Sequence, residues 1–200
     1  MSQTSFDRAI ALFDAANAED PRFDEVDGAR IPRELLYSQR MAEMIQRFAP
    51  EAGEAAQLAC RAQHIQRWKT PRDSYPMDRT GYLQWRTGLY KFHAETAGRL
   101  MREAGYDDAT IEQVQTAVGK KGLKVNPDTQ MMEDVGDLVF IEHYMQGFAG
   151  QKADYSEEKW LDILRKTWKK MSERARDFAL SGGIKLPEPL VPLIVKAIQG

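Results

Sequence analysis

The sequence predicts an all-α protein, a compact single-domain helical bundle that covers residues 1–200. Apolar residues recur at steps of three and four along every long segment, which is the spacing of one helical face. The sequence contains no strand-like alternation of useful length and no internal repeat. At 200 residues the chain is long enough to bury one core, so one domain is expected.

Four helices are expected in the first half of the chain. They cover about residues 6–20, 33–48, 51–68 and 82–104. Phe6 and Phe13 belong to the apolar face of the first helix, and Pro50 separates the second from the third. Alanines in the third helix favour helix formation. Residues 20–32, and residues 70–80 with the sequence TPRDSYPMDRT, are rich in proline and turn-forming residues and are expected to be loops.

Four more helices are expected in the second half. They run from Asp107 or Asp108 to about Val118, from Asp128 through Met145, from Ser156 to about Leu180, and through the tail LPEPLVPLIVKAIQ. Residues 119–127 form a punctuated segment that carries three lysines. A Gly-containing break precedes Ser156, and the tail is expected to pack back on the body as a short closing helix.

Composition excludes several classes of partner. With 28 basic and 30 acidic residues the net charge is −2, so no global field attracts nucleic acid or a membrane surface, and any anion site must be local. The single Cys60 excludes an intramolecular disulfide and a multi-cysteine zinc cluster. The N-terminus lacks the basic start and apolar run of a signal peptide, and no apolar stretch approaches the ~20 residues that span a bilayer. We expect a cytoplasmic protein.

The segment from Gln63 to Arg86 carries the strongest signal for a binding site. Arginines alternate there with aromatic residues around a proline-framed loop. A guanidinium group presents a planar fork to carboxylate or phosphate oxygens, and aromatic faces stack on a base or on the guanidinium itself. The expected substrate-binding residues are Arg67, Trp68, Arg72, Arg79, Trp85, Arg86, Lys120 and Lys121. The alternative is that the loop arginines bond carbonyls and acids that hold the loop together, with Asp73 and Asp78 as nearby partners.

Histidines and acids interrupt otherwise apolar helices at a few positions. His64 and His93 each lie among apolar residues, and Glu133 and Asp134 precede the apolar run from Leu138. Such groups are suited to proton transfer. The alternative for each histidine is a hydrogen-bonded core or surface residue, which is the more common role of a single histidine on a helix.

Several short motifs follow one another in the order of a known superfamily. They read YSQRMA with Tyr37, ACRAQHI with Gln63 and His64, HAETAGRLM with His93, and EDVGDLVF with Asp134 or, as a weaker match, Asp137. The chain in this respect resembles the HD-domain superfamily, helical metal-dependent phosphohydrolases whose ligands follow the order His, His-Asp, and a distant Asp. The resemblance implies an HD-like core over about residues 33–147 and a C-terminal helical extension over about 156–199.

The chain departs from the HD pattern at the metal ligands. Tyr37 and Gln63 stand where the superfamily has histidines, and the carboxylate of the His-Asp pair is lost. Phenol and amide groups are poorer ligands for a divalent ion than imidazole. We therefore expect no stoichiometric metal at Tyr37, Gln63, His64 and Asp134, and the sequence leaves the cofactor undetermined.

A closer resemblance covers Phe6 to about Met145. The motifs AQHIQRW, TPR, YP, WR, FHA, KK and MEDV are similar to an uncharacterised bacterial and fungal family known by a domain-of-unknown-function label. Members of this family are sometimes labelled glutamyl-tRNA synthetases. The sequence has neither a Rossmann-type nucleotide motif nor the length of a synthetase, so it gives that label no support.

Two functions fit these residues. In the first, the chain is an HD-like enzyme that acts on a small phosphorylated or carboxylated substrate without the usual HD metal centre, and His64 is the general acid or base. The catalytic residues expected for it are Gln63, His64, His93, Glu133 and Asp134. In the second, the chain is a non-catalytic regulatory module that binds a small anionic metabolite or a nucleotide. The oligomeric state is left open.

Overall fold

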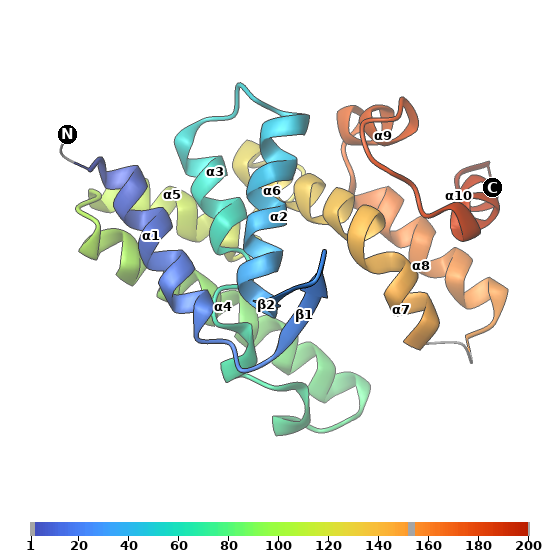
Figure 1. The fold of residues 1–200 in the computed structure, drawn as a ribbon, viewed down its shortest axis with the longest axis horizontal. Helices are drawn as coiled ribbons and strands as arrows, with labels where there is room; N and C mark the ends of the chain where they lie inside the picture. Colours follow the sequence, from blue (N-terminus) through green and yellow to red (C-terminus); the bar gives the residue numbers. More distant parts are fainter. Residues whose placement is uncertain (1–2, 152–154, 200) are drawn as a thin grey trace.

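The helices that the apolar periodicity predicts are present in the computed structural model, which describes residues 3–151 and 155–199 (Figure 1). They are α1 (Ser5–Ala18), α2 (Arg33–Phe48), α3 (Glu54–Ala62), α4 (Arg79–Glu103), α5 (Asp108–Val118), α6 (Pro127–Val139), α7 (Met145–Gln151), α8 (Glu157–Lys170), α9 (Glu173–Leu180) and α10 (Val191–Gln199). Short 3₁₀ turns cover Arg67–Lys69, Arg72–Ser74 and Glu188–Leu190, and a π-helical turn covers Phe140–Tyr144. The bounds of α2 and the Asp107 cap and end of α5 agree with the sequence prediction.

The segment 20–32 is a β-hairpin, so the prediction that it forms a loop is wrong. Strands β1 (Phe23–Val26) and β2 (Ala29–Pro32) pair antiparallel, with Val26 opposite Ala29. Asp27 and Gly28 join them with φ of 50° and 77°, and two successive positive φ values make the type of two-residue turn that Asp-Gly favours. The described chain is thus mostly helical with one small hairpin, rather than all-α.

The third helix ends six residues earlier than predicted, at Ala62 instead of Trp68. The chain turns at residues 63–66, where Gln66 has a positive φ of 52°. Its backbone N–H donates to the side chain of Asn17 on α1, a contact between segments 49 residues apart. Gln63 and His64 therefore lie in this turn and not within α3.

Two long predicted helices are also broken. The helix expected from Asp128 to Met145 contains the π-helical turn between α6 and α7. The helix expected over 156–180 is α8 followed by α9, because Ser172 accepts a hydrogen bond from the Ala175 N–H and so caps a new helix. The Gly-containing break predicted before Ser156 lies partly outside the described residues, at 152–154.

The core is formed where α1 to α6 meet. Its fully buried side chains include Phe13, Met41, Ile45, Leu58, Met101, Ile111, Met132 and Leu138. α6 packs on α2, α3 and α5, and it also contacts α8 and α9, which lie in Figure 1 on the side away from α1. The closing helix expected in the tail is α10, which packs on α8. None of the helices in the described ranges is both long and apolar enough to cross a membrane.

Candidate functional site

Two adjoining cavities lie where α2, α4, α6 and the turn after α3 meet. Their volumes are about 320 Å³ and about 240 Å³. Gln63, His64, Arg67 and Lys120 line both of them, so these four side chains form the wall between the two spaces. The early end of α3 therefore has a direct consequence, because it places Gln63 and His64 in this wall.

The two cavities differ in the charged residues that line them. We call the larger one the carboxyl cavity, since its lining includes Glu34, Glu133 and Asp137. We call the smaller one the cationic cavity, since its lining includes Arg67, Arg86 and Lys120 and no aspartate or glutamate.

Helical periodicity brings the α4 residues to the cationic cavity. Trp85, Leu89 and His93 follow one another at steps of four, and Arg86 and Tyr90 lie next to them on the same side of the helix. The same spacing places Glu34 and Tyr37 of α2 one turn apart in the carboxyl cavity.

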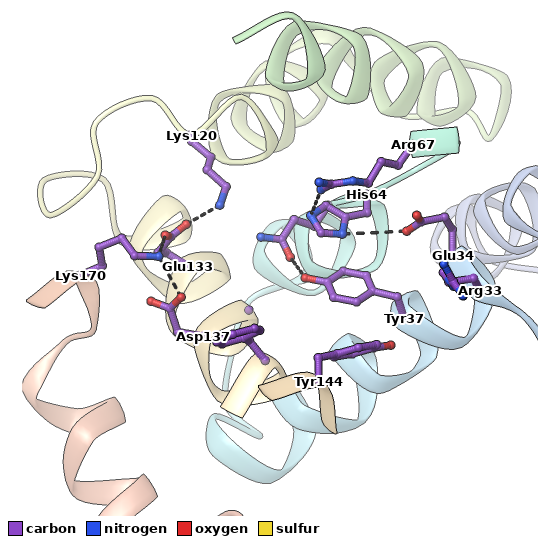
Figure 2. Close-up of a pocket in the computed structure, with 13 residues that line it drawn as sticks. Arg33, Glu34, Tyr37, His64, Arg67, Lys120, Glu133, Asp137, Tyr144 and Lys170 are labelled. Carbon is purple, nitrogen blue, oxygen red and sulfur yellow. Dashed lines mark hydrogen bonds and ion pairs between the residues drawn. The ribbon is translucent and has the colours of Figure 1, made fainter. Parts of the chain in front are cut away.

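His64 lies between a cation and a carboxyl group (Figure 2). Arg67 Nη1 is 3.0 Å from His64 Nε2. Because a guanidinium group only donates, Nε2 accepts, and the neutral ring has its proton on Nδ1, which lies 3.9 Å from Glu34 Oε2. Burial, and then the charge of Arg67, lower the pKa of His64 well below its usual value. The imidazole is neutral at pH 7, and the lone pair on its Nε2 accepts the hydrogen bond from Arg67.

Tyr37 packs against one face of this imidazole. Its ring stacks on His64 with 4.2 Å between centroids, and its hydroxyl donates to Gln63 Oε1 at 2.5 Å. The approach of α6 to Gln63 is close, because a Cβ on Gly136 would lie only 3.1 Å from the Gln63 amide nitrogen. Tyr37, Gln63 and His64 thus form one packed, hydrogen-bonded unit.

Glu34 is a buried carboxyl group with a perturbed protonation equilibrium. It accepts a hydrogen bond from Arg22 at 2.9 Å, and its side chain is 6% exposed. Burial raises the pKa of Glu34 to about 7, although the positive charges of Arg67 and Arg22 oppose the shift. Near neutral pH this group can both give and accept a proton.

A second charged cluster faces it across the carboxyl cavity (Figure 2). Glu133 is bonded to Lys120 at 2.6 Å and to Lys170 at 2.7 Å, and Lys170 also bonds Asp137 Oδ1 at 2.9 Å. Burial alone would raise the pKa of Glu133, but the two lysines outweigh it and lower that pKa to about 2. Burial and the nearby Glu133 charge instead raise the pKa of Asp137 to about 7, against the pull of Lys170.

The cationic cavity combines positive charge with aromatic surface. The guanidinium of Arg67 lies 5.1 Å from the Trp85 ring centroid, and Arg86 is hydrogen-bonded to the Tyr90 hydroxyl. Neither of these two contacts neutralises a charge. His93 Nδ1 donates to the Ile65 carbonyl at 2.8 Å, and burial lowers the pKa of this imidazole to about 3. Its Nε2 atom is therefore an unprotonated acceptor.

Three buried side-chain polar atoms in the described part of the chain have no hydrogen-bond partner. They are His93 Nε2, Asp137 Oδ2 and Tyr144 Oη. Buried polar groups in proteins are nearly always bonded, so each exception calls for an explanation. All three belong to residues that line one of the two cavities.

Most of the sequence-predicted site residues lie at these cavities. Those that line one or both are Gln63, His64, Arg67, Trp85, Arg86, His93, Lys120 and Glu133. Those that line neither are Trp68, Arg72, Arg79, Lys121 and Asp134. Lys121 is exposed and lines a separate groove beside Tyr90.

Asp134, one of the expected catalytic residues, lines neither cavity. Asp134 accepts hydrogen bonds from the Ser172 N–H at 2.7 Å, the Ser172 hydroxyl at 2.6 Å and Gln130. It lies one helical position from Glu133, and this rotation about α6 turns it toward α9 instead of the cavity. Its contacts give it a structural role.

Arg72 follows the alternative interpretation. Arg72 donates to the carbonyl oxygens of Tyr75 and Asp78, at 3.1 and 3.2 Å, and so ties the loop together. Arg79 is exposed at the first turn of α4. Trp68 is half-buried in the 3₁₀ turn, with Lys69 near its ring.

Among the cavity residues absent from the predicted site, four carry polar groups that matter for the chemistry, namely Glu34, Asp137, Tyr144 and Lys170. Glu34 lies three residues before the YSQRMA motif without being part of it, Tyr144 lies in the π-helical turn outside any recognised motif, and Asp137 was only the weaker match for the last HD position. Lys170 follows Asp137 by 33 positions, on a helix with no recognised motif, and only its contact with Glu133 and Asp137 reveals it.

The donor set does not fit the usual HD metal centre. Within the described residues there is no group of three or more His, Cys, Asp and Glu placed to hold a metal ion. Tyr37 and Gln63 are bonded to each other, and His64 is bonded to Arg67. The expectation that no metal is bound stoichiometrically stays a prediction for elemental analysis.

Comparison with known proteins identifies the family of the chain. No curated protein and no solved structure is similar to the chain. Residues 7–194, which run from α1 into α10, match the family model described as Domain of unknown function (DUF4202). The match supports the expected domain-of-unknown-function family and gives no link to the HD superfamily. By this match over most of its length, the chain belongs to the DUF4202 family.

Proposed function

We propose that the protein is an enzyme that binds a small phosphorylated or carboxylated substrate in the cationic cavity and transfers protons to it from the adjoining carboxyl cavity. The observation that carries the proposal is the charge of the cationic cavity. Arg67, Arg86 and Lys120 line it, and no carboxylate does. Lys120 is already paired with Glu133, whereas Arg67 and Arg86 have no ion-pair partner among the described residues, so a bound anion offsets the repulsion between these two guanidinium groups.

Arg67 is the central binding group in this proposal. The other cations of the carboxyl cavity have carboxylate partners, namely Asp24 for Arg33, and Glu133 for Lys120 and Lys170. Arg67 is held instead by the neutral His64 ring, which orients its fork without neutralising it. His64 then acts as a positioning residue for Arg67, in place of the general acid or base expected from the sequence.

Glu34 and Asp137 are the proposed acid–base groups. A general acid or base works best when its pKa lies near the working pH, and burial brings both carboxyl groups to a pKa of about 7. Glu34 also faces His64, which joins the two cavities. Glu133, which is ionised and bonded to two lysines, is proposed to hold Lys120 in place.

We also propose that the resemblance to HD proteins reflects a common arrangement of the site. Support comes from Tyr37, Gln63, His64 and Asp137, which occupy HD-like positions in the sequence and line one cavity. A rebuilt, metal-free site agrees with the ligand types at these positions.

The test of anion binding compares two arginine variants. Isothermal titration with inorganic phosphate and with phosphorylated metabolites is expected to detect binding to the parent, and Arg67→Ala should weaken it by about tenfold or more, since it removes a charge-assisted hydrogen bond. Arg79→Ala is the matched control, because Arg79 is exposed and lines neither cavity. Equal effects of the two substitutions would refute the proposal.

A non-catalytic binding module remains the second candidate, favoured by the loss of HD ligand types at Tyr37 and Gln63. Turnover of the bound compounds distinguishes the two. For the enzyme, Asp137→Asn and Glu34→Gln should each lower kcat by about a hundredfold or more while binding persists. A ligand that binds through Arg67 and is never converted would favour the module.

A further inference from the structure

The unpartnered Nε2 atom of His93 narrows the chemistry of the anion, if the proposed function is correct. His93 is 2% exposed and lines the cationic cavity from α4. Its Nδ1 proton is committed to the Ile65 carbonyl, so the ring cannot rotate to offer a donor without breaking that bond. Its remaining Nε2 lone pair has no hydrogen-bond partner in the described chain.

A hydrogen-bond acceptor in a cavity lined by cations discriminates between anions that carry a proton and anions that do not. Arg67, Arg86 and Lys120 are donors only, and they satisfy the bare oxygens of any anion. Apart from a water molecule, only a ligand that also carries a proton to donate can satisfy the lone pair of His93. A fully deprotonated carboxylate or sulfate has none and would place an oxygen lone pair against the nitrogen lone pair, which leaves the acceptor unpaired.

We propose that the cationic cavity is a site for a phosphate group that keeps an O–H, and that this O–H donates to His93 Nε2 while the three cations bind the other oxygens. Inorganic phosphate and the monoanion of a phosphomonoester share this chemistry. Of the two substrate classes left open above, phosphorylated and carboxylated, it selects the phosphorylated one.

The test uses three tetrahedral anions of the same charge. At about pH 8 inorganic phosphate is mainly HPO₄²⁻, whereas sulfate and monofluorophosphate are dianions of similar size without a proton. Titration calorimetry with the unmodified protein is expected to give phosphate a Kd about tenfold lower than either of the others, the value of one well-made hydrogen bond. This comparison needs no variant and therefore does not depend on a substitution being tolerated.

Two substitutions of His93 assign the preference to its Nε2 atom. The amide of Asn reaches the Nδ1 position and can still donate to the Ile65 carbonyl, whereas the amide of Gln reaches the Nε2 position. His93→Asn is expected to bring the three Kd values within about twofold by weakening phosphate alone, and His93→Gln to keep part of the preference. Circular dichroism establishes that each variant is folded.

The outcomes separate this inference from the proposed function. If all three anions bind equally and Arg67→Ala weakens them all, the anion site stands and the role of His93 is wrong. If no anion binds, both proposals fail. A phosphate preference that survives unchanged in folded His93→Asn also overturns the inference, because the phosphate O–H would then donate to a group other than His93.

Discussion

At the residue scale, burial sets the protonation of the site more strongly than the neighbouring charges do. His64 and His93 are kept neutral, and Glu34 and Asp137 are pushed toward neutrality at pH 7. Glu133 is the exception, because two lysines bond it directly and keep it ionised. The same residue types thus have opposite protonation preferences within one pair of cavities, which no local sequence pattern discloses.

Glu34→Gln tests the raised pKa of this carboxyl group through stability. Its pKa is about 7 in the folded protein against 4.5 for a free, solvated glutamate, so the unfolded chain loses the proton first as pH rises. The contribution of Glu34 to the free energy of unfolding is therefore full below about pH 4.5, falls between pH 4.5 and 7, and stays low above. The expected loss is up to about 3 kcal/mol.

Urea unfolding of parent and Glu34→Gln at about pH 5 and about pH 8 measures this loss. Relative to the parent, the variant should gain stability as the pH rises, since glutamine does not ionise. The matched control is Glu43→Gln on the same helix, where the side chain is 66% exposed. A difference between Glu34→Gln and the parent that is the same at both pH values would contradict the raised pKa.

At the scale of the element, helix ends depend on contacts as well as on local signals. Pro32 and Pro50 flank α2, and its bounds could be predicted from them. After α3 ends at Ala62 the chain forms a tight turn up to Gln66, whose left-handed conformation Asn17 holds from another helix. The hairpin had a local signal in Asp27-Gly28, and the prediction missed it because the flanking strands have only four residues each.

Asp134→Ala is expected to loosen the attachment of α9 to α6. The substitution leaves the Ser172 N–H and hydroxyl without their acceptor and should lower the free energy of unfolding by about 2–4 kcal/mol. Asp134→Asn, which keeps one acceptor, should cost less. Phosphate affinity, measured by calorimetry on the folded variant, should change less than about twofold. A stable variant that no longer binds phosphate would contradict this prediction and show that Asp134 contributes to binding.

Gly81→Ala is expected to destabilise the start of α4, against the usual benefit of alanine in a helix. A Cβ at this position would collide with the Pro76 carbonyl oxygen, so the backbone of the 70–80 loop must shift, at a cost of about 1–3 kcal/mol. The control is Gly147→Ala in α7, where a Cβ meets nothing within 4 Å and helix propensity should add about 0.5–1 kcal/mol. Thermal unfolding should therefore move the two melting temperatures in opposite directions.

At the scale of the whole molecule, the site depends on the C-terminal helices as well as on the predicted core. Lys170, the last residue of α8, reaches Glu133 and Asp137 on α6 and completes the charged side of the carboxyl cavity. Ser172 attaches the start of α9 to the same helix. The segment expected to be an extension is therefore part of the candidate site.

Anion binding should weaken with ionic strength, because it depends on local charge in a molecule whose net charge is only −2. Raising an inert salt from about 0.05 M to about 0.5 M is expected to increase the Kd for phosphate several-fold, as the screening length falls below the size of the cavity. Calorimetry at four salt concentrations measures the slope. Arg67→Ala should reduce that slope, and a Kd independent of salt would argue against binding by the three cations.

The helical class, most helix positions and the stretch of chain that supplies the cavity wall could all be predicted from the amino-acid sequence. These follow from local physics, since apolar periodicity, proline breaks and caps act over a few residues. Residue type and spacing also placed Arg67 and His93 in the predicted site, and both line the cationic cavity. That Asp137 faces the cavity, and that Lys170 completes the site, became evident only from the folded arrangement. Both depend on the rotation of α6 and on which distant helix packs against it, and burial, which sets the protonation of Glu34 and Asp137, exists only once the chain is folded.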